Sequence, residues 1–264
     1  MAMPALSTAA TGMLARELDI SVIAHNIANI STTGFKRQRA EFQDLLYQTS
    51  VRPGVNSSDT GTIVPTGMQV GLGTKAAGIY HINEQGPLVE TKNPYDVAIR
   101  DHGMFRIQMP DGSYSYTRAG SFRLSPTSEI VNDKGYIVTP GLVIPPQTLS
   151  ITINDSGQVI ANISGSLTPV VVGQFDLVDF PNVSGLSAMG DNLFAETAAS
   201  GSPIVGIPNT NGMGSLLQGW LESSNTDAVT ELTKMIEAQR GYELCSKIIS
   251  TADEMMRTAV QSKS

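Results

Sequence analysis

Residues 6–37 read LSTAATGMLARELDISVIAHNIANISTTGFKR, an amphipathic stretch followed by a polar stop. Apolar residues recur at steps of three and four from Leu6 to Ile27, and Glu17 interrupts them. The stripe consists of Leu6, Ala10, Met13, Ile20, Ala24 and Ile27. This spacing predicts a helix with one apolar face. The polar run from Ser31 to Gly34 predicts its end, because glycine readily takes the left-handed conformation that terminates helices.

The C-terminal region carries a second stripe of the same kind. Its members are Val229, Leu232, Ile236, Leu244, Ile248, Met255 and Ala259. Their spacing predicts a helix of roughly 30 residues, with Asn225 or Thr226, together with Asp227, as candidate N-cap residues. Gln239 and Arg240 interrupt the stripe just before Gly241, and a glycine inside a helix costs about 1 kcal/mol relative to alanine. A polar break of this kind can set the register of packed helices.

Between these two regions the pattern changes to a period of two. Phe105, Ile107 and Met109 alternate with polar residues, and the turn sequence PDG at 110–112 follows, which predicts a hairpin. The glycine- and proline-rich stretches 50–73 and 200–215 predict loops, the first a long ordered loop or an irregular hairpin. We therefore expect an α+β fold, in which the terminal helices pair as an α-helical coiled-coil domain and the central domain is mostly β.

The overall charge argues against a nucleic-acid partner. The 264-residue chain has a net charge of -7 and a pI near 4.9, whereas nucleic-acid-binding domains carry clustered lysines and arginines. The basic residues Lys36, Arg37 and Arg39 form too short a run to change this. The single cysteine, Cys245, excludes an internal disulfide and is expected to be a buried or half-buried apolar residue.

No segment reaches the ~18 consecutive apolar residues of a membrane span, so we expect no membrane-spanning helix. Arg16, Glu17 and Asp19 interrupt the apolar N-terminal stretch, which is unlike a cleavable signal peptide. If the protein leaves the cytoplasm, we expect another export route.

Residues that could take part in catalysis or bind a metal are few and scattered. Asp96, Asp101 and His102 lie close together in the sequence, but no second histidine or glutamate cluster accompanies them. Such groups near a turn are more often solvated side chains than catalysts or ligands. His25 lies between apolar neighbours and is expected to be a packed or interface residue and not a ligand. We therefore expect no catalytic residue, no cofactor and no metal.

The two terminal helices need a partner for their apolar stripes. Each could pack against the other, and a two-helix pair would still leave apolar surface open along its length. Neighbouring copies would cover that surface, which predicts a polymer. The alternative is that both helices pack across one face of the β domain within a single molecule.

Three blocks of the sequence, residues 5–42, 93–125 and 221–255, resemble the bacterial flagellar rod and hook proteins, and the resemblance covers nearly the whole chain. Residues 45–74 and 182–201 are more similar to rod members of that family than to the hook protein. One departure is AIRDHGMF at 98–105, because the family usually has a Gly-x-Gly-Phe-Phe turn there. Because Asp101 and His102 replace a more flexible start, the resemblance does not define the shape of this turn.

The resemblance implies a self-assembling structural subunit: the terminal helices line a hollow, torque-transmitting tube that encloses an export channel, and the β domain forms its outer layer. It implies a coiled-coil domain of residues 1–32 and 225–264, a linking segment 33–75 and a β-rich domain 76–224. Expected partners are further copies of the chain, proximal rod proteins, hook or hook-junction proteins, and the surrounding L and P rings. The expected location in the cell is the flagellar basal body, in the periplasmic rod.

The residues expected at subunit interfaces lie on the two helices and at their ends. Apolar candidates are Leu6, Met13, Ile20, Ile27, Leu232, Ile236, Leu244 and Ile248, and polar candidates that would set the stagger are Asn26, Asn29, Gln239 and Arg240. By analogy with the family, an insertion at 46–68 would stiffen the polymer. Its candidates are Tyr47, Arg52, Pro53, Gly54 and Pro65. The remaining alternatives are another rod or hook-type member of this family, or a secreted β-domain enzyme with helical flanks.

Overall fold

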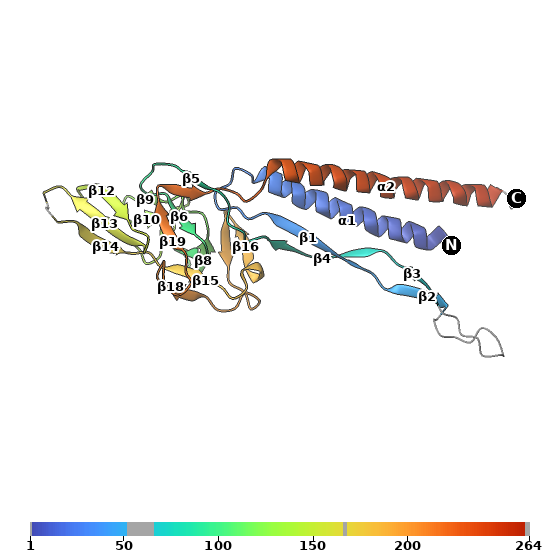
Figure 1. Cartoon of the computed structure of the whole chain (residues 1–264), viewed down its shortest axis with the longest axis horizontal. Coiled ribbons are helices and arrows are strands. Elements are labelled where there is room, and N and C mark those ends of the chain that lie inside the picture. Colours follow the sequence, from blue (N-terminus) through green and yellow to red (C-terminus); the bar gives the residue numbers. More distant parts are fainter. Residues whose placement is uncertain (1, 52–65, 166–167, 262–264) are drawn as a thin grey trace. The chain divides into compact units, whose positions relative to one another are not determined.

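The computed structural model describes residues 2–51, 66–165 and 168–261, which form one helix near each end of the chain and a mostly β region between them (Figure 1). Helix α1 spans Ala2–Ala28 and helix α2 spans Ala228–Gln261. Both helices predicted from apolar periodicity are therefore confirmed, as is the α+β class. Among the described residues, neither helix is apolar enough over its length to cross a membrane.

The chain divides into two compact units. The first contains residues 1–27, 38–80 and 228–264, and the second contains residues 28–37 and 81–227. We call them the helical unit and the β unit. The chain passes from one to the other four times, at 27/28, 37/38, 80/81 and 227/228.

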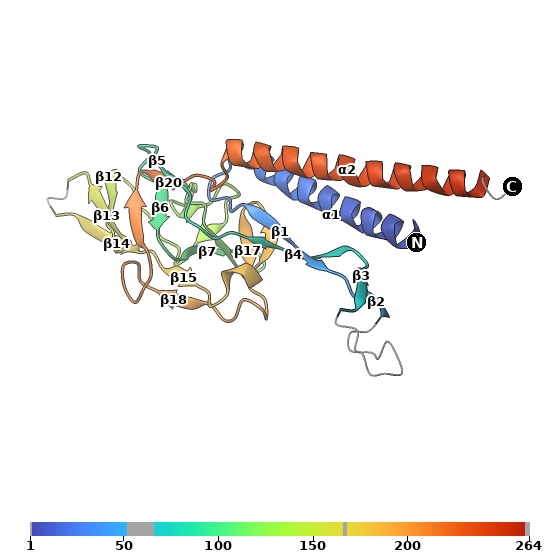
Figure 2. The same ribbon diagram turned by 45° about the vertical axis from the view of Figure 1, so that its right-hand side comes forward.

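In the helical unit, α1 and α2 lie side by side and run in opposite directions, so that the first half of α1 lies along the second half of α2 in both views (Figures 1 and 2). Small residues lie at their contact. A Cβ added to Gly12 would lie 3.2 Å from the sulfur of Cys245, and one added to Gly241 would lie 3.0 Å from Nε of Arg16. Gly241, which would weaken α2 as an isolated helix, therefore permits a close approach of α2 to α1.

The helical unit also contains a long two-stranded ribbon. Strand β1 (Gln38–Asp44) pairs with β4 (Thr74–His81), and β2 (Tyr47–Val51) pairs with β3 (Met68–Gly71). The second pair is antiparallel, with Tyr47 opposite Gly71 and an irregularity between Thr49 and Val51. The described ends of the stretch 50–73 thus belong to an irregular hairpin, one of the two forms expected for it.

The β unit contains the remaining strands. They are β5 (Leu88–Glu90), β6 (Val97–Arg100), β7 (Met104–Gln108), β8 (Tyr114–Thr117), β9 (Arg123–Leu124), β10 (Ile130–Val131), β11 (Ile137–Val138), β12 (Thr148–Ile153), β13 (Gln158–Ile163), β14 (Val170–Gln174), β15 (Leu177–Asp179), β16 (Ser187–Gly190), β17 (Leu193–Ala195), β18 (Ile204–Gly206), β19 (Ser215–Gln218) and β20 (Trp220–Glu222). A short 3-10 helix, η1, spans Val183–Gly185.

These strands form one large sheet and several small ones. The large sheet has the order β16-β17-β8-β7-β11-β10-β9, and β15 pairs with both β7 and β18. Strands β12, β13 and β14 form a separate antiparallel sheet, while β6 pairs with β19 and β5 with β20. Strand β18 lies inside the stretch 200–215 that we expected to be a loop. Its three residues are strand because their backbone pairs with β15, a partner that local composition does not reveal.

The core of the β unit is organised around the predicted hairpin, β7–β8. Phe105 and Ile107 are fully buried on one side of β7, as the alternation predicts. The ring of Phe105 lies edge-on to Phe122, with 4.9 Å between centroids, and Phe175 packs against both. A smaller cluster on the other side of β7 includes Met104 and Tyr116. The two clusters give the β unit a well-packed base for the polar network described next.

Candidate functional site: a polar joint and an exposed helix face

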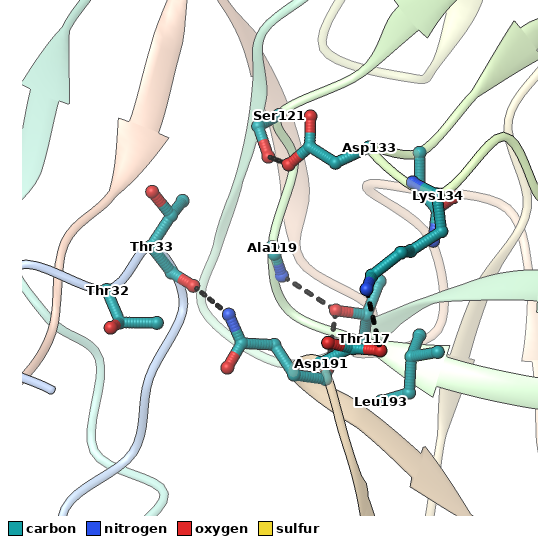
Figure 3. Close-up of a pocket in the computed structure, with 11 residues that line it drawn as sticks. Thr32, Thr33, Thr117, Ala119, Ser121, Asp133, Lys134, Asp191 and Leu193 are labelled. Carbon is teal, nitrogen blue, oxygen red and sulfur yellow. Dashed lines mark hydrogen bonds and ion pairs between the residues drawn. The ribbon is translucent and has the colours of Figure 1, made fainter.

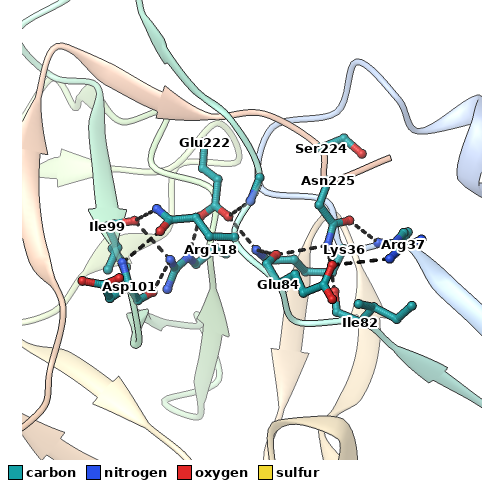
Figure 4. A network of polar contacts seen from close by, with 12 residues as sticks. Lys36, Arg37, Ile82, Glu84, Ile99, Asp101, Arg118, Glu222, Ser224 and Asn225 are labelled. Carbon is teal, nitrogen blue, oxygen red and sulfur yellow. Dashed lines mark hydrogen bonds and ion pairs between the residues drawn. The ribbon is translucent and has the colours of Figure 1, made fainter. Parts of the chain in front are cut away.

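A buried carboxylate, Glu222, is the centre of a polar network in the β unit (Figure 4). Glu222 is the last residue of β20 and has an exposed fraction of 1%. Its Oε1 accepts hydrogen bonds from Nζ of Lys36, at 2.5 Å, and from the backbone N–H of Gly86, at 2.9 Å. Its Oε2 accepts one from Nε of Arg118 at 2.6 Å. Two segments far apart in the sequence, at Lys36 and Gly86, and Arg118 therefore converge on one side chain.

Arg118 follows β8 and is also buried, with an exposed fraction of 6%. Besides binding Glu222, its guanidinium donates to the backbone carbonyls of Ile99, Asp101 and Gly103. A planar guanidinium has five N–H donors in a fixed geometry, so it can hold several carbonyls in place at once. Arg118 thus fixes the turn between β6 and β7 relative to β20.

The segment that leaves α1 is held by the same network. Nζ of Lys36 donates to the carbonyl of Glu84 at 2.8 Å as well as to Glu222. The N–H of Gly34 donates to the backbone carbonyl of Glu222 at 2.8 Å. Gly34 has φ +68°, and a Cβ there would lie 2.7 Å from the backbone nitrogen of Ala119. Only glycine fits this close approach without strain.

Asn225 connects the segment before α2 to the other two. Its Oδ1 accepts from the N–H of Arg37 at 2.8 Å, and its Nδ2 donates to the carbonyls of Ile82 and Glu84. The N–H of Ile82 in turn donates to the carbonyl of Arg37. We predicted Asn225 as a candidate N-cap, but its amide binds these backbone groups.

We call residues 34–37, 82–86 and 222–225 with Arg118 the joint. All of them belong to the β unit. Three of the four points at which the chain passes between the units lie within three residues of a joint member, and the fourth, at 27/28, lies six residues before Gly34. The joint therefore anchors, on the β unit's side, every covalent connection to the helical unit.

The charges in the joint shift the pKa values of its members. Burial alone would raise the pKa of the Glu222 carboxyl, but Arg118 and Lys36 together hold that pKa below its usual value of 4.5. Burial lowers the pKa of the Lys36 ammonium, and the attraction of Glu222 offsets only part of this effect. Removing one partner would leave a buried charge uncompensated, which typically costs about 3–5 kcal/mol.

A polar pocket of about 300 Å³ lies near the joint in the β unit (Figure 3). Its lining side chains bind one another: Nδ2 of Asn192 donates to the carbonyl of Thr33 at 3.1 Å, and Lys134 pairs with Asp191 at 3.3 Å. Oγ of Ser121 donates to Asp133 at 3.1 Å. These contacts tie the loop after α1 to two hairpin turns, and they give the pocket a structural role.

The apolar interface candidates on the two helices differ in exposure. Leu6, Met13, Ile20 and Ile27 on α1 are half-buried. Those on α2 are exposed, with fractions of 51% for Leu232, 51% for Ile236, 63% for Leu244 and 49% for Ile248. The buried residues of α2 are Glu231, Ala238 and Ala252. Hence α2 presents a small-residue side to α1 and leaves its apolar stripe uncovered in the single chain.

Asn26 has a role within the chain. It is buried, its Oδ1 accepts from the N–H of Gln38, and its Nδ2 donates to the carbonyl of Gln38 and to Oε2 of Glu231. We expected Asn26 to make polar contacts between subunits; these hydrogen bonds instead connect α1 with β1 and α2. Asn29 is half-buried and accepts from Thr32, while Gln239 and Arg240 are exposed on α2.

Neighbouring polar side chains bind the carboxylate near the start of β6. The carboxylate of Asp96 accepts from Oγ1 of Thr91 at 2.6 Å and from Nδ2 of Asn93 at 2.9 Å. Among the described residues, no group of three His, Cys, Asp or Glu side chains is placed to hold a metal ion. Asp101 adopts φ +70°, a conformation in which a glycine is unstrained, and it directs its carbonyl to Arg118.

The sequence did not identify the joint as a charge network. We noted Lys36 only as part of a short basic run, and we did not single out Glu84, Arg118 or Glu222. The available signal was a charged residue directly after the apolar pair Trp220 and Leu221, because a charge in such a position needs a partner. Its partners lie 104 and 186 positions away, at Arg118 and Lys36, and no local pattern connects them.

Three family models match the chain in separate regions. Residues 6–36 match "Flagella basal body rod protein", residues 98–161 match "Flagellar hook protein FlgE/F/G D1 domain", and residues 217–262 match "Flagellar basal body rod FlgEFG protein C-terminal". The first and third regions contain most of α1 and all of α2, together with much of the joint.

Whole-chain relatives agree with these matches. The flagellar basal-body rod protein FlgG of Caulobacter vibrioides is 52% identical over 99% of this chain and 100% of its own length. FlgG of Agrobacterium fabrum is 48% identical over 96% and 97%, and FlgG of Borreliella burgdorferi is 47% identical over 97% and 97%. At this identity and coverage, the chain belongs to the FlgG family of flagellar basal-body rod proteins, a family named for a structural role and not for catalysis.

Proposed function

We propose that the chain is a subunit of the distal flagellar rod that assembles helically through its terminal helices. In this role it forms a rigid hollow driveshaft, which transmits motor torque towards the hook and encloses the export channel. The observation that carries the proposal is the exposed apolar stripe of α2. Leu232, Ile236, Leu244 and Ile248 repeat at helical spacing, and each is about half exposed or more in the single chain.

Self-association is favoured because this stripe has no cover within the described chain. Burying an apolar side chain such as leucine or isoleucine contributes about 1.5–3 kcal/mol. The small-residue side of α2 is already used by α1, so the stripe is available to other copies. We propose that α1 and α2 pair as a coiled coil and that neighbouring pairs cover the stripe, with Leu6, Met13, Ile20 and Ile27 completing the packing.

Polar residues at the helix surfaces would set the register between copies. Gln239 and Arg240 are exposed beside the stripe, and Asn29 follows the end of α1. Polar groups at such positions discriminate between alternative staggers more than they add affinity.

The ribbon β1–β4 with β2–β3 is the proposed stiffening element. An isolated two-stranded ribbon is marginally stable in water. This one exposes Leu46, Tyr47 and Met68, at 82%, 56% and 60%. Packing of these side chains against a neighbouring copy would oppose sliding between subunits. The other candidates of the 46–68 insertion, Arg52, Pro53, Gly54 and Pro65, lie outside the described residues.

The proposed organisation keeps residues 1–32 and 225–264 as the inner domain, 33–75 as the linking segment and 76–224 as the outer domain. The proposed partners are further copies of the chain, proximal rod proteins, hook or hook-junction proteins, and the L and P rings.

The test is negative-stain imaging and sedimentation of the purified full chain beside versions that lack residues 1–32 or 225–264. We expect concentration-dependent tubes or oligomers from the full chain and none from either truncated chain. A full chain that stays monomeric at high concentration contradicts the proposal.

The stiffening role is tested by deleting residues 46–68. The shortened chain should still polymerise but should form curved polymers, measured as a shorter persistence length in electron micrographs. Straight polymers from the deletion variant would remove this assignment.

A further inference from the structure

We propose that the joint carries mechanical force between the connecting segments and the β unit, and that Glu222 is its positioning residue. This inference rests on the proposed function, since load exists only in a working rod. The joint would hold the three connecting segments at fixed places on the β unit, so that force arriving along one of them is shared by all.

The first argument is topological. All four passages of the chain between the units occur at the ends of segments 28–37, 81–86 and 222–227. Any force transmitted through the backbone must enter or leave the β unit along these segments. Covalent connectivity alone would load them one at a time, because each could peel away from the β unit separately.

The second argument is the way the segments are tied. Oε1 of Glu222 binds both Lys36 and the N–H of Gly86, and Lys36 also binds the carbonyl of Glu84. Asn225 joins the same segments a second time through Arg37 and Ile82. The bonds run between segments and are loaded in parallel, so displacing one segment requires several to break together.

The third argument is burial. The side chains of Lys36, Arg118 and Glu222 have exposed fractions of 5%, 6% and 1%. Water does not compete for these bonds as it does at exposed pairs such as Arg123–Asp133, where the exposed fractions are 77% and 57%. Buried ion pairs often stabilise a fold no more than well-packed apolar residues would, and one attested role for them is to fix geometry, which is the role proposed here.

The fourth argument is that Arg118 connects the network to the core. Its guanidinium binds three carbonyls of the turn between β6 and β7, and β7 carries the buried Phe105 and Ile107. A force on any connecting segment therefore reaches the packed centre of the β unit through a short chain of contacts.

The experiment compares Glu222→Gln with Glu90→Gln in the full-length chain. Glu90 is an exposed carboxylate on β5, opposite Trp220 of β20, so the control makes the same chemical change one strand away. Hydrogen exchange is measured at the amides of Gly34, Arg37, Ile82 and Gly86, with β7 and β8 as internal reference. Polymers of each variant are sheared in flow and their lengths are measured by electron microscopy.

We expect the four joint amides to exchange at least tenfold faster in Glu222→Gln while β7 and β8 are unchanged, and its polymers to break to less than half the wild-type length. Glu90→Gln should match the wild type in both measurements. Unchanged exchange at the joint amides, or wild-type resistance to shear, overturns the proposal. Failure of the wild type to polymerise refutes the proposed function instead, and exchange then still decides whether Glu222 holds the joint.

A second variant covers the case in which Glu222→Gln does not fold. Lys36→Met, Arg118→Met and Glu222→Met together remove all three charges and leave none buried alone. We expect this variant to fold and to show the same faster exchange and fragile polymers. A folded triple variant with wild-type exchange and strength overturns the proposal.

Discussion

At the scale of single residues, the molecule depends on a few side chains in unusual surroundings. Glu222 is a buried carboxylate between two buried cations, and Gly34 lets the chain pass against the backbone of Ala119. Their importance is that long-range contacts in the β unit depend on them.

Stability should depend on pH through Glu222. Its folded pKa lies below the unfolded value near 4.5, so its contribution is complete above pH 4.5 and is lost as pH falls through the lower, folded pKa. We expect the free energy of unfolding to decrease between pH 5 and 3 more steeply in the wild type than in the triple methionine variant. Denaturant titrations at each pH measure this, and equal slopes would contradict it.

Gly34→Ala should destabilise the β unit by more than about 2 kcal/mol, because it combines a left-handed backbone with a clash against fixed backbone atoms. Gly112→Ala is the control. Gly112 also has a positive φ, +84°, but a Cβ there would meet nothing within 4 Å. The free energy of unfolding of Gly112→Ala should fall by only about 1 kcal/mol. Denaturant unfolding of both variants measures the difference, and similar losses would show that the close approach is unimportant.

At the scale of elements, helix α2 has two sides of different composition. Glycine, alanine and cysteine of α2 lie towards α1, and larger aliphatic residues form the exposed stripe. Sequence periodicity placed these aliphatic residues on one stripe, which we expected to pack with the other helix, whereas the structure leaves the stripe exposed and buries Ala238 and Ala252 instead. A helix with two usable sides can pack within its own chain and against other copies at the same time.

Replacing Ile20 and Ile236 by Asp should abolish polymerisation and leave the β unit folded, because charged groups in an apolar contact are costly to bury. Ser246→Asp adds a charge at an exposed polar position of α2 and should leave assembly intact. Sedimentation measures assembly, and near-ultraviolet circular dichroism reports the aromatic core of the β unit. Wild-type assembly by the Ile20 and Ile236 variant would count against the stripe.

At the scale of the whole molecule, net charge opposes the association of copies. With a net charge of -7, identical chains repel one another at low ionic strength. Salt shortens the range of this repulsion to about 8 Å at physiological ionic strength. Apolar contact between the helices should therefore become more effective as salt is added.

We expect the critical concentration for polymerisation to fall as sodium chloride rises from about 10 to 150 mM, the range over which screening changes most. Light scattering at a series of protein concentrations measures it. A critical concentration that rises with salt would mean that ion pairs between subunits, and not apolar stripes, dominate the contact.

The sequence by itself determined the two terminal helices, the β7–β8 hairpin, the α+β class and the family. These features follow from local periodicity, turn residues and contiguous motifs, all of which are read within a window of a few tens of residues. The resemblance also implied that a linking segment begins at residue 33, shortly after α1.

Only the tertiary structure decided which groups make up the joint and which side of α2 remains exposed. Lys36, Arg118 and Glu222 meet from positions 104 and 186 residues apart, and Asn26 meets Glu231 across 205 residues. Periodicity states that a side chain is buried or exposed, but it does not say against which partner. That choice is made when distant segments pack, because a buried charge is stable only where its partners arrive from elsewhere in the chain.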